Sequence, residues 1–167
     1  GIRKKGFVGS LSNTRPSLKI KLDYIDKSGE LAGWTKLTFN NNQQDQCLAS
    51  QFLTYKLANA LGVPAPRVSF ARVTVNGSYL GVYSHVEAVR EPLLERGFGS
   101  SKGVLFEGTV VDFRKGWSKS FELKVGDEKR GRARIEQLIK VLEECDDADL
   151  QVELAKLVDL DAFYRFW

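Results

Sequence analysis

The middle of the chain, residues 67–89, reads RVSFARVTVNGSYLGVYSHVEAV. Two runs rich in β-branched and aromatic residues, 67–75 and 78–89, lie on either side of Asn76-Gly77. Asn-Gly between two such runs is the strongest short-range signal of a β-hairpin, because a type I′ turn needs positive φ at both central residues. The stretch therefore predicts a long antiparallel hairpin.

Upstream of this hairpin, the pattern predicts two strands and one helix. Residues 17–25 alternate apolar and polar side chains, as a half-buried strand does, and residues 34–39 form a second short strand. Asp45 is a good N-cap for a helix running to about Leu61, where glycine and proline stop it. This helix is apolar over most of its circumference, which predicts that it is buried. The basic, glycine-containing segment 3–10 suits a turn or loop.

Downstream of the hairpin, the pattern becomes mostly helical. Helices are predicted at 91–98, 135–142 and 150–158, and short strands at 104–113 and 121–125. Strands, one helix, a hairpin and a helical second half predict an α+β fold with an antiparallel sheet. This is also the element order of a protein-kinase small lobe leading into a helical lobe. We expect a single domain, 1–167, with the small lobe at about 1–90 and the connector and start of the helical lobe at about 91–167.

Composition excludes several classes of protein. The 167 residues are 43% hydrophobic and 28% charged, with 25 Lys and Arg against 21 Asp and Glu, which is typical of a globular domain. No apolar run approaches the roughly 18 residues of a membrane-spanning helix. Two cysteines and one histidine are too few for a disulfide scaffold or a Cys- or His-based metal centre, so no metal ligand is assigned. Exposed aromatics do not interleave with a basic stripe, which disfavours nucleic-acid binding.

The last residues predict an aromatic helix face. A helix capped by Asp159 or Asp161 would present Phe163, Phe166 and Trp167 on one side. Because a large exposed aromatic patch is costly in an isolated domain, we expect the chain to be a piece of a longer protein.

Three pairs of stretches together resemble the CotH family, the kinases related to spore coat protein H. They are Ile2–Gly6 with Ser10 and then Ser17–Asp23, Leu37–Asn41 with Asp45 and then Leu61–Pro66, and Val75–Tyr83 with Glu87 and then Gly103–Phe106. The resemblance covers about the first 115 residues in family order. Cys47, Ser50 and Glu107 depart from it, standing where the family usually has Ser, Arg and Lys.

The resemblance implies an atypical kinase that transfers the γ-phosphate of ATP to Ser or Thr hydroxyls of coat or surface proteins, with Mg²⁺ or Mn²⁺. It places the protein in the spore coat, at the cell surface or outside the cell. The metal-binding and catalytic aspartates are then expected C-terminal to Trp167. The alternative is a non-catalytic coat or surface protein of the same family that acts by protein binding.

Lysines of the first predicted strand are the main candidates for binding ATP phosphates. Lys19 and Lys21 share one strand face, and Lys21 is the favoured phosphate ligand; the simpler interpretation is a solvated strand face. Arg3, Gly6 and Ser10 are candidates for a phosphate-binding loop.

The end of the hairpin is the candidate adenine site. Val86, Glu87 and Ala88 stand where a kinase hinge would meet the base through backbone groups. Glu87 could instead pair with a lysine or be a plain edge-strand carboxylate, and both alternatives stay open.

Overall fold

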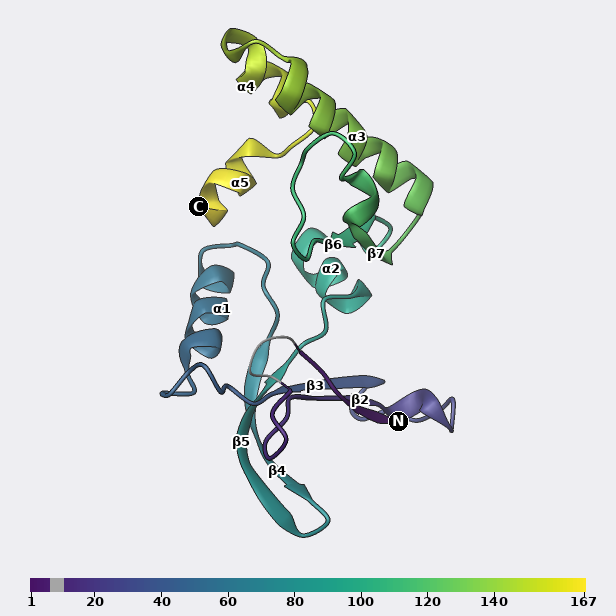
Figure 1. Cartoon of the computed structure of the whole chain (residues 1–167), viewed down its shortest axis with the longest axis vertical. Helices are drawn as coiled ribbons and strands as arrows, with labels where there is room; N and C mark the ends of the chain where they lie inside the picture. The colour runs from purple at the N-terminus through teal and green to yellow at the C-terminus, as the bar shows by residue number, and fades with distance from the viewer. Residues whose placement is uncertain (7–10) are drawn as a thin grey trace. The chain divides into compact units, whose positions relative to one another are not determined.

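A five-stranded antiparallel sheet forms the basis of the first of two compact units, Gly1–Val89 (Figure 1). The computed structural model describes residues 1–6 and 11–167. The strand order is β1-β2-β3-β5-β4. The strands are β1 (Ile2–Lys4), β2 (Leu18–Lys21), β3 (Lys36–Asn40), β4 (Val68–Val75) and β5 (Ser78–Val86). With the helices, this sheet confirms the predicted α+β class and is consistent with a kinase-like small lobe followed by a helical region.

The predicted central hairpin is confirmed as β4 and β5. Asn76 and Gly77 have φ of 49° and 82°, both positive as a type I′ turn requires, and Val75 pairs with Ser78 across the turn. The second strand ends at Val86, three residues before the predicted end.

The amino-terminal strands differ from prediction in their bounds. Arg3 and Lys4 fell in segment 3–10, which was predicted as turn or loop, but they belong to the edge strand β1 (Ile2–Lys4) because its backbone pairs with β2. β2 ends at Lys21 and a 3₁₀ turn, η1 (Leu22–Tyr24), follows it, so the predicted strand to residue 25 was too long.

The helix after β3 starts later than predicted and is exposed. Helix α1 spans Ser50–Ala60, because Asn42 and Leu48 have positive φ and fold the preceding residues into turns. Asp45 still accepts a hydrogen bond from the Ser50 N–H at 2.7 Å. The prediction of a buried helix was wrong: no residue of α1 is buried, since only part of its apolar circumference meets the sheet, as at the Phe52–Phe70 ring contact of 5.4 Å.

The second unit, Arg90–Trp167, combines a small hairpin with helices (Figure 1). The predicted helix 91–98 is confirmed as α2 and ends at Gly99 in the left-handed conformation. The predicted strand 104–113 was too long, since Val110 has a φ of 55° and only three residues pair. The remaining elements are β6 (Leu105–Glu107), η2 (Ser118–Ser120), β7 (Glu122–Val125), α3 (Glu128–Glu144), α4 (Asp147–Ala155) and α5 (Leu160–Phe166).

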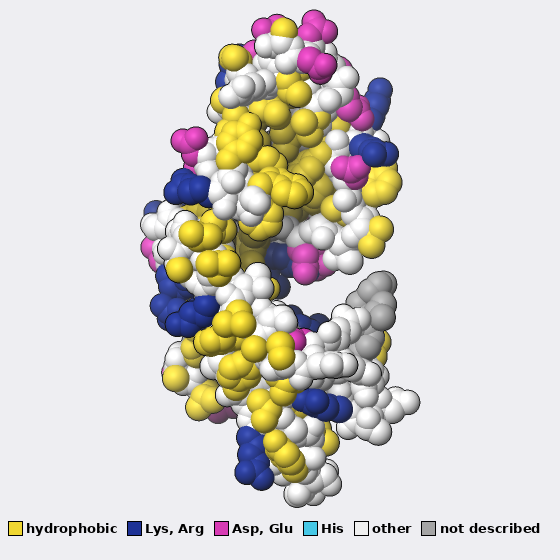
Figure 2. All heavy atoms as spheres, turned by 90° about the vertical axis from the view of Figure 1, so that its left-hand side faces the viewer, with side chains coloured by type: hydrophobic (Ala, Val, Ile, Leu, Met, Phe, Trp, Pro, Cys, Tyr) yellow, Lys and Arg dark blue, Asp and Glu magenta, His cyan; other side chains and the backbone are white. Residues whose placement is uncertain are grey.

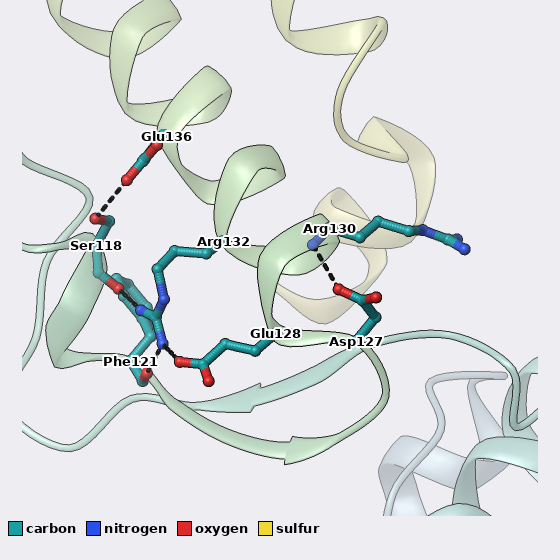
Figure 3. A network of polar contacts seen from close by, with 7 residues as sticks. All are labelled: Ser118, Phe121, Asp127, Glu128, Arg130, Arg132 and Glu136. Carbon is teal, nitrogen blue, oxygen red and sulfur yellow. Dashed lines mark hydrogen bonds and ion pairs between the residues drawn. The ribbon is translucent and has the colours of Figure 1, made fainter.

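Arg132 links α3 to the small hairpin of this unit and to the residues that lead into its second strand (Figure 3). Its guanidinium donates to the Ser118 and Phe121 carbonyls, pairs with Glu128, and lies over the Phe106 ring at 5.3 Å. This network explains the arginine-rich start of α3 as structural at this position, because a guanidinium supplies several donors in one plane.

Each unit by itself leaves hydrophobic side chains exposed, and Figure 2 shows some of them. Asp159 caps α5 by accepting from the Ala162 N–H at 2.9 Å. Trp167 is 87% exposed and Phe166 is 72% exposed. Along the described residues, none of the helices has both the length and the apolar character needed to cross a membrane.

Candidate functional site

Four basic side chains share one face of the sheet across β1, β2 and β3. Lys19 and Lys21 alternate along β2; Arg3 lies opposite Lys19, and Lys36 lies opposite Lys21. Residues two apart on a strand, and residues directly opposite on neighbouring strands, point to the same face. The register therefore gathers these four cations into one cluster.

The four cations line a groove of about 390 Å³, the basic groove. Among the residues that the structure describes, its lining has no carboxylate and consists of Gly1, Ile2, Arg3, Lys19, Ile20, Lys21, Tyr24 and Lys36. Lys19, Lys21 and Lys36 are half-buried, and Arg3 is exposed. Over residues 1–6 and 11–167, neither Arg3, Lys21 nor Lys36 forms an ion pair with an acidic side chain. The groove is thus a region of positive potential suited to an anion.

The structure brings together three of the predicted phosphate-binding residues: Arg3, Lys19 and Lys21. Gly6, with a φ of 117°, does not line the groove. Ser10 lies outside the described residues. Sequence analysis missed Lys36: it fell within the predicted strand 34–39, but only the register of β2 against β3 shows that it faces Lys21.

The predicted adenine-binding residues lie toward the same end of the sheet as Lys36. β3 and β5 pair antiparallel at Phe39–His85 and Asn40–Ser84. Because the two strands run in opposite directions, the residues that follow His85 head toward the end of β3 at which Lys36 lies. This topology places the 86–88 segment beside the end of the sheet that carries the Lys21–Lys36 pair.

Glu87 closes the open end of the β4–β5 hairpin. Its carboxylate Oε2 accepts a hydrogen bond from the Arg67 N–H at 2.8 Å, and its own N–H donates to the Arg67 carbonyl at 2.9 Å. The residue is only 6% exposed. Its side chain thus holds the hairpin end in place, while Val86 and Ala88 flank it.

The asparagines after β3 tie the neighbouring segments together. Asn40 accepts from Lys5 Nζ at 3.0 Å and donates to Gln51 Oε1 of α1 at 2.8 Å. Asn41, 3% exposed, donates its backbone N–H to Ser17 Oγ at 3.0 Å and its side-chain amide to the Arg15 carbonyl at 2.7 Å. These amides position the start of β2, and hence Lys19 and Lys21, against β3.

Other polar side chains of this unit have structural partners. The Cys47 thiol donates to Asp45 Oδ1 at 3.0 Å, which, with the Ser50 N–H, lowers the pKa of the Asp45 carboxyl. Burial lowers the pKa of His85, whose ring packs on Phe39 at 5.2 Å. Helix α1 contains neither Asp nor Glu. In the part of the chain that the structure describes, no three His, Cys, Asp or Glu side chains come together to hold a metal ion.

The order of sheet strands, helix and hairpin in the first unit is consistent with a kinase-like small lobe. Residues 2–167 match the family described as CotH kinase protein, and the chain belongs to this family. Over 102 residues it is 28% identical to the inner spore coat protein H-like protein of Bacillus subtilis (strain 168). That match covers 57% of this chain and 33% of the relative, so the chain spans about a third of that protein's length.

Proposed function

We propose that the full-length protein is an ATP-dependent kinase that phosphorylates Ser or Thr hydroxyls of coat or surface proteins. The observation that carries the proposal is the basic groove, with four cations on one sheet face and no carboxylate among the described residues that line it. Phosphoryl transfer depends on positioning the phosphates and neutralising their charge, which such a groove supports. The family description names a kinase, and the spore-coat relative motivates the class of protein substrate.

In this proposal, ATP lies across the sheet, with its base toward Val86–Ala88 and its phosphates over the groove. Neighbouring strands are about 4.8 Å apart, so roughly 14 Å separates β5 from β1. Lys21, in the central strand of the groove, is the main phosphate ligand, and Lys19 and Arg3 lie beside it. Gly6 and Ser10 remain predicted members of a phosphate-binding loop.

A kinase of this kind also needs Mg²⁺ or Mn²⁺. The described residues do not fit such an ion, because they contain no suitable group of acidic side chains. We therefore assign no step through a metal to this chain. The placement of the metal-binding and catalytic aspartates C-terminal to Trp167 stays a prediction.

One observation favours the second candidate, a non-catalytic binding protein of the same family. In protein kinases, the phosphate-binding lysine pairs with a glutamate of the helix that packs on the sheet. Helix α1 contains no acidic residue, so this pair cannot form here. The groove would then bind an anionic ligand or partner without phosphoryl transfer.

Incubation of the full-length protein with labelled ATP and either Mg²⁺ or Mn²⁺ tests the two candidates. Metal-dependent labelling of the protein or of Ser-rich substrates supports the kinase. No transfer, together with no nucleotide-induced rise in Tm, supports the binding protein.

Within an active kinase, Lys21→Ala should abolish or strongly reduce transfer without unfolding the protein. The matched control is Lys27→Ala, because Lys27 is exposed in the connection between β2 and β3 and does not line the groove. Transfer by Lys21→Ala at the rate of the control would refute the role assigned to Lys21.

A further inference from the structure

We propose that Lys36 is a second phosphate-binding lysine, and that it and Lys21 form one of two cation pairs that select ligands with several linked phosphates. This inference deepens the proposed function and rests on its assignment of the groove to phosphates. It concerns a residue that the strand pattern alone did not single out.

The β2–β3 register brings Lys36 directly opposite Lys21. Directly opposite residues on one face of an antiparallel pair have Cβ atoms about 4.5–5.5 Å apart, so two lysine side chains can reach the same anion. Both lysines are half-buried in the groove, and the described residues offer neither of them an ion-pair partner.

A pair of like charges in these positions destabilises the sheet when no anion is bound. Like charges directly opposite one another destabilise strand pairing, and partial burial reduces the screening of their repulsion by water. Beside the Lys21–Lys36 pair, the register places a second pair of cations, Arg3 and Lys19, on the same face. A bound anion removes the repulsion and gains charge-assisted hydrogen bonds from both members.

The spacing of the two pairs indicates the kind of anion. They are two residues apart along β2, which corresponds to about 6.7 Å. A single phosphate can meet one pair, whereas a chain of linked phosphates can meet both. The groove therefore favours the triphosphate part of a nucleotide over orthophosphate.

Calorimetric titration of the full-length protein with orthophosphate, pyrophosphate and tripolyphosphate, without metal, tests this inference. For the wild type, we expect affinity to rise with each added phosphate. Lys36→Gln should weaken tripolyphosphate binding about tenfold, the scale of one hydrogen bond between charged groups, and Lys36→Arg should restore most of it. Lys27→Gln, with the same loss of charge, should bind like the wild type.

The Tm without ligand gives a second readout, which distinguishes a phosphate-binding lysine from one that only stabilises the fold. Because Lys36→Gln relieves the repulsion with Lys21, its Tm without ligand should equal or exceed that of Lys27→Gln. A lower Tm, with binding lost in proportion to unfolding, would overturn the binding role.

The outcomes separate this inference from the proposed function. Equal tripolyphosphate affinity in Lys36→Gln and wild type, or no binding by the wild type, overturns the inference even if labelled ATP shows kinase activity. Tripolyphosphate binding that depends on Lys36 supports the inference even if no phosphate transfer is found, an outcome that would count against the kinase alone.

Discussion

Replacement of Gly131 by alanine tests how tightly α3 packs on the small hairpin of the second unit. Gly131 is buried in the first turns of α3, and a Cβ there would lie 2.5 Å from both Phe106 Cε2 and Val104 Cγ1. Favourable carbon–carbon contacts are about 3.5–4.0 Å, so both groups would have to withdraw by about 1 Å. The Phe106 ring is further held by the Arg132 guanidinium over it.

Two opposing effects set the magnitude. Alanine is favoured over glycine in a helix by about 1 kcal/mol, whereas overpacking a filled site costs about 1–3 kcal/mol. Because two groups must move at once, we take the upper part of the overpacking range and subtract the gain in helix propensity. We therefore expect Gly131→Ala to lower the free energy of unfolding by about 1–2 kcal/mol. Urea unfolding followed by far-UV circular dichroism, which reports the helices, measures the change.

Two further variants make the test decisive. Ala133→Gly, at an exposed position of the same helix, measures helix propensity alone. Phe106→Leu relieves one of the two close contacts and leaves the one with Val104, so the penalty of Gly131→Ala should be smaller in the double variant. If Gly131→Ala stabilised the protein by the amount that Ala133→Gly destabilises it, the close packing of α3 on the hairpin would be refuted.

Three other changes test the first unit. Asn41→Ala removes the buried donor to the Arg15 carbonyl and should cost about 1–3 kcal/mol in urea unfolding, whereas exposed Asn13→Ala should change little. Because burial lowers the pKa of His85, the unfolded chain takes up its proton first, so the free energy of unfolding should fall as the pH drops below the ordinary histidine pKa. His85→Phe keeps a ring against Phe39 and should remove this pH dependence of the free energy of unfolding. If the pH profile of the variant equalled that of the wild type, His85 would not be its source. The hydrogen bond from the Cys47 thiol, with that from the Ser50 N–H, lowers the pKa of Asp45, so the first residue of α1 should lose its hydrogen bond to Asp45 only as the pH falls through that lowered value. Circular dichroism should show this acid transition in wild type and not in Asp45→Ala.

Local chemistry explains which elements could be predicted from the sequence. The β4–β5 hairpin depends on Asn76-Gly77, whose positive φ values are available to those two residues wherever the fold places them. Helix α2 ends where Gly99 adopts the left-handed conformation. Both signals lie within a few residues of the structure that they determine.

Elements that depend on distant partners could not be predicted in the same way. β1 is a strand only because β2 pairs with it, and its own three residues carry no periodic signal. The start of α1 was predicted too early because Leu48 adopts a positive φ that its residue type does not favour.

The same distinction between local and distant signals applies to the residues of the candidate site. Alternation along one strand was enough to predict that Lys19 and Lys21 share a face. Lys36 joins them through the register of two strands that are separated by η1 and a turn. An offset of one residue would move it to the opposite face.

The shortness and charge of β1 also bear on solubility. β1 is an outer strand of the five-stranded sheet, and its three residues include Arg3 and Lys4. Short, basic outer strands discourage pairing with the sheet of another molecule, which is a common route to aggregation. Because Arg3 also lines the basic groove, a polyanion bound there would offset part of this protection. With a polyanion bound, resistance to aggregation would then depend more on the short length of β1 and less on its charge.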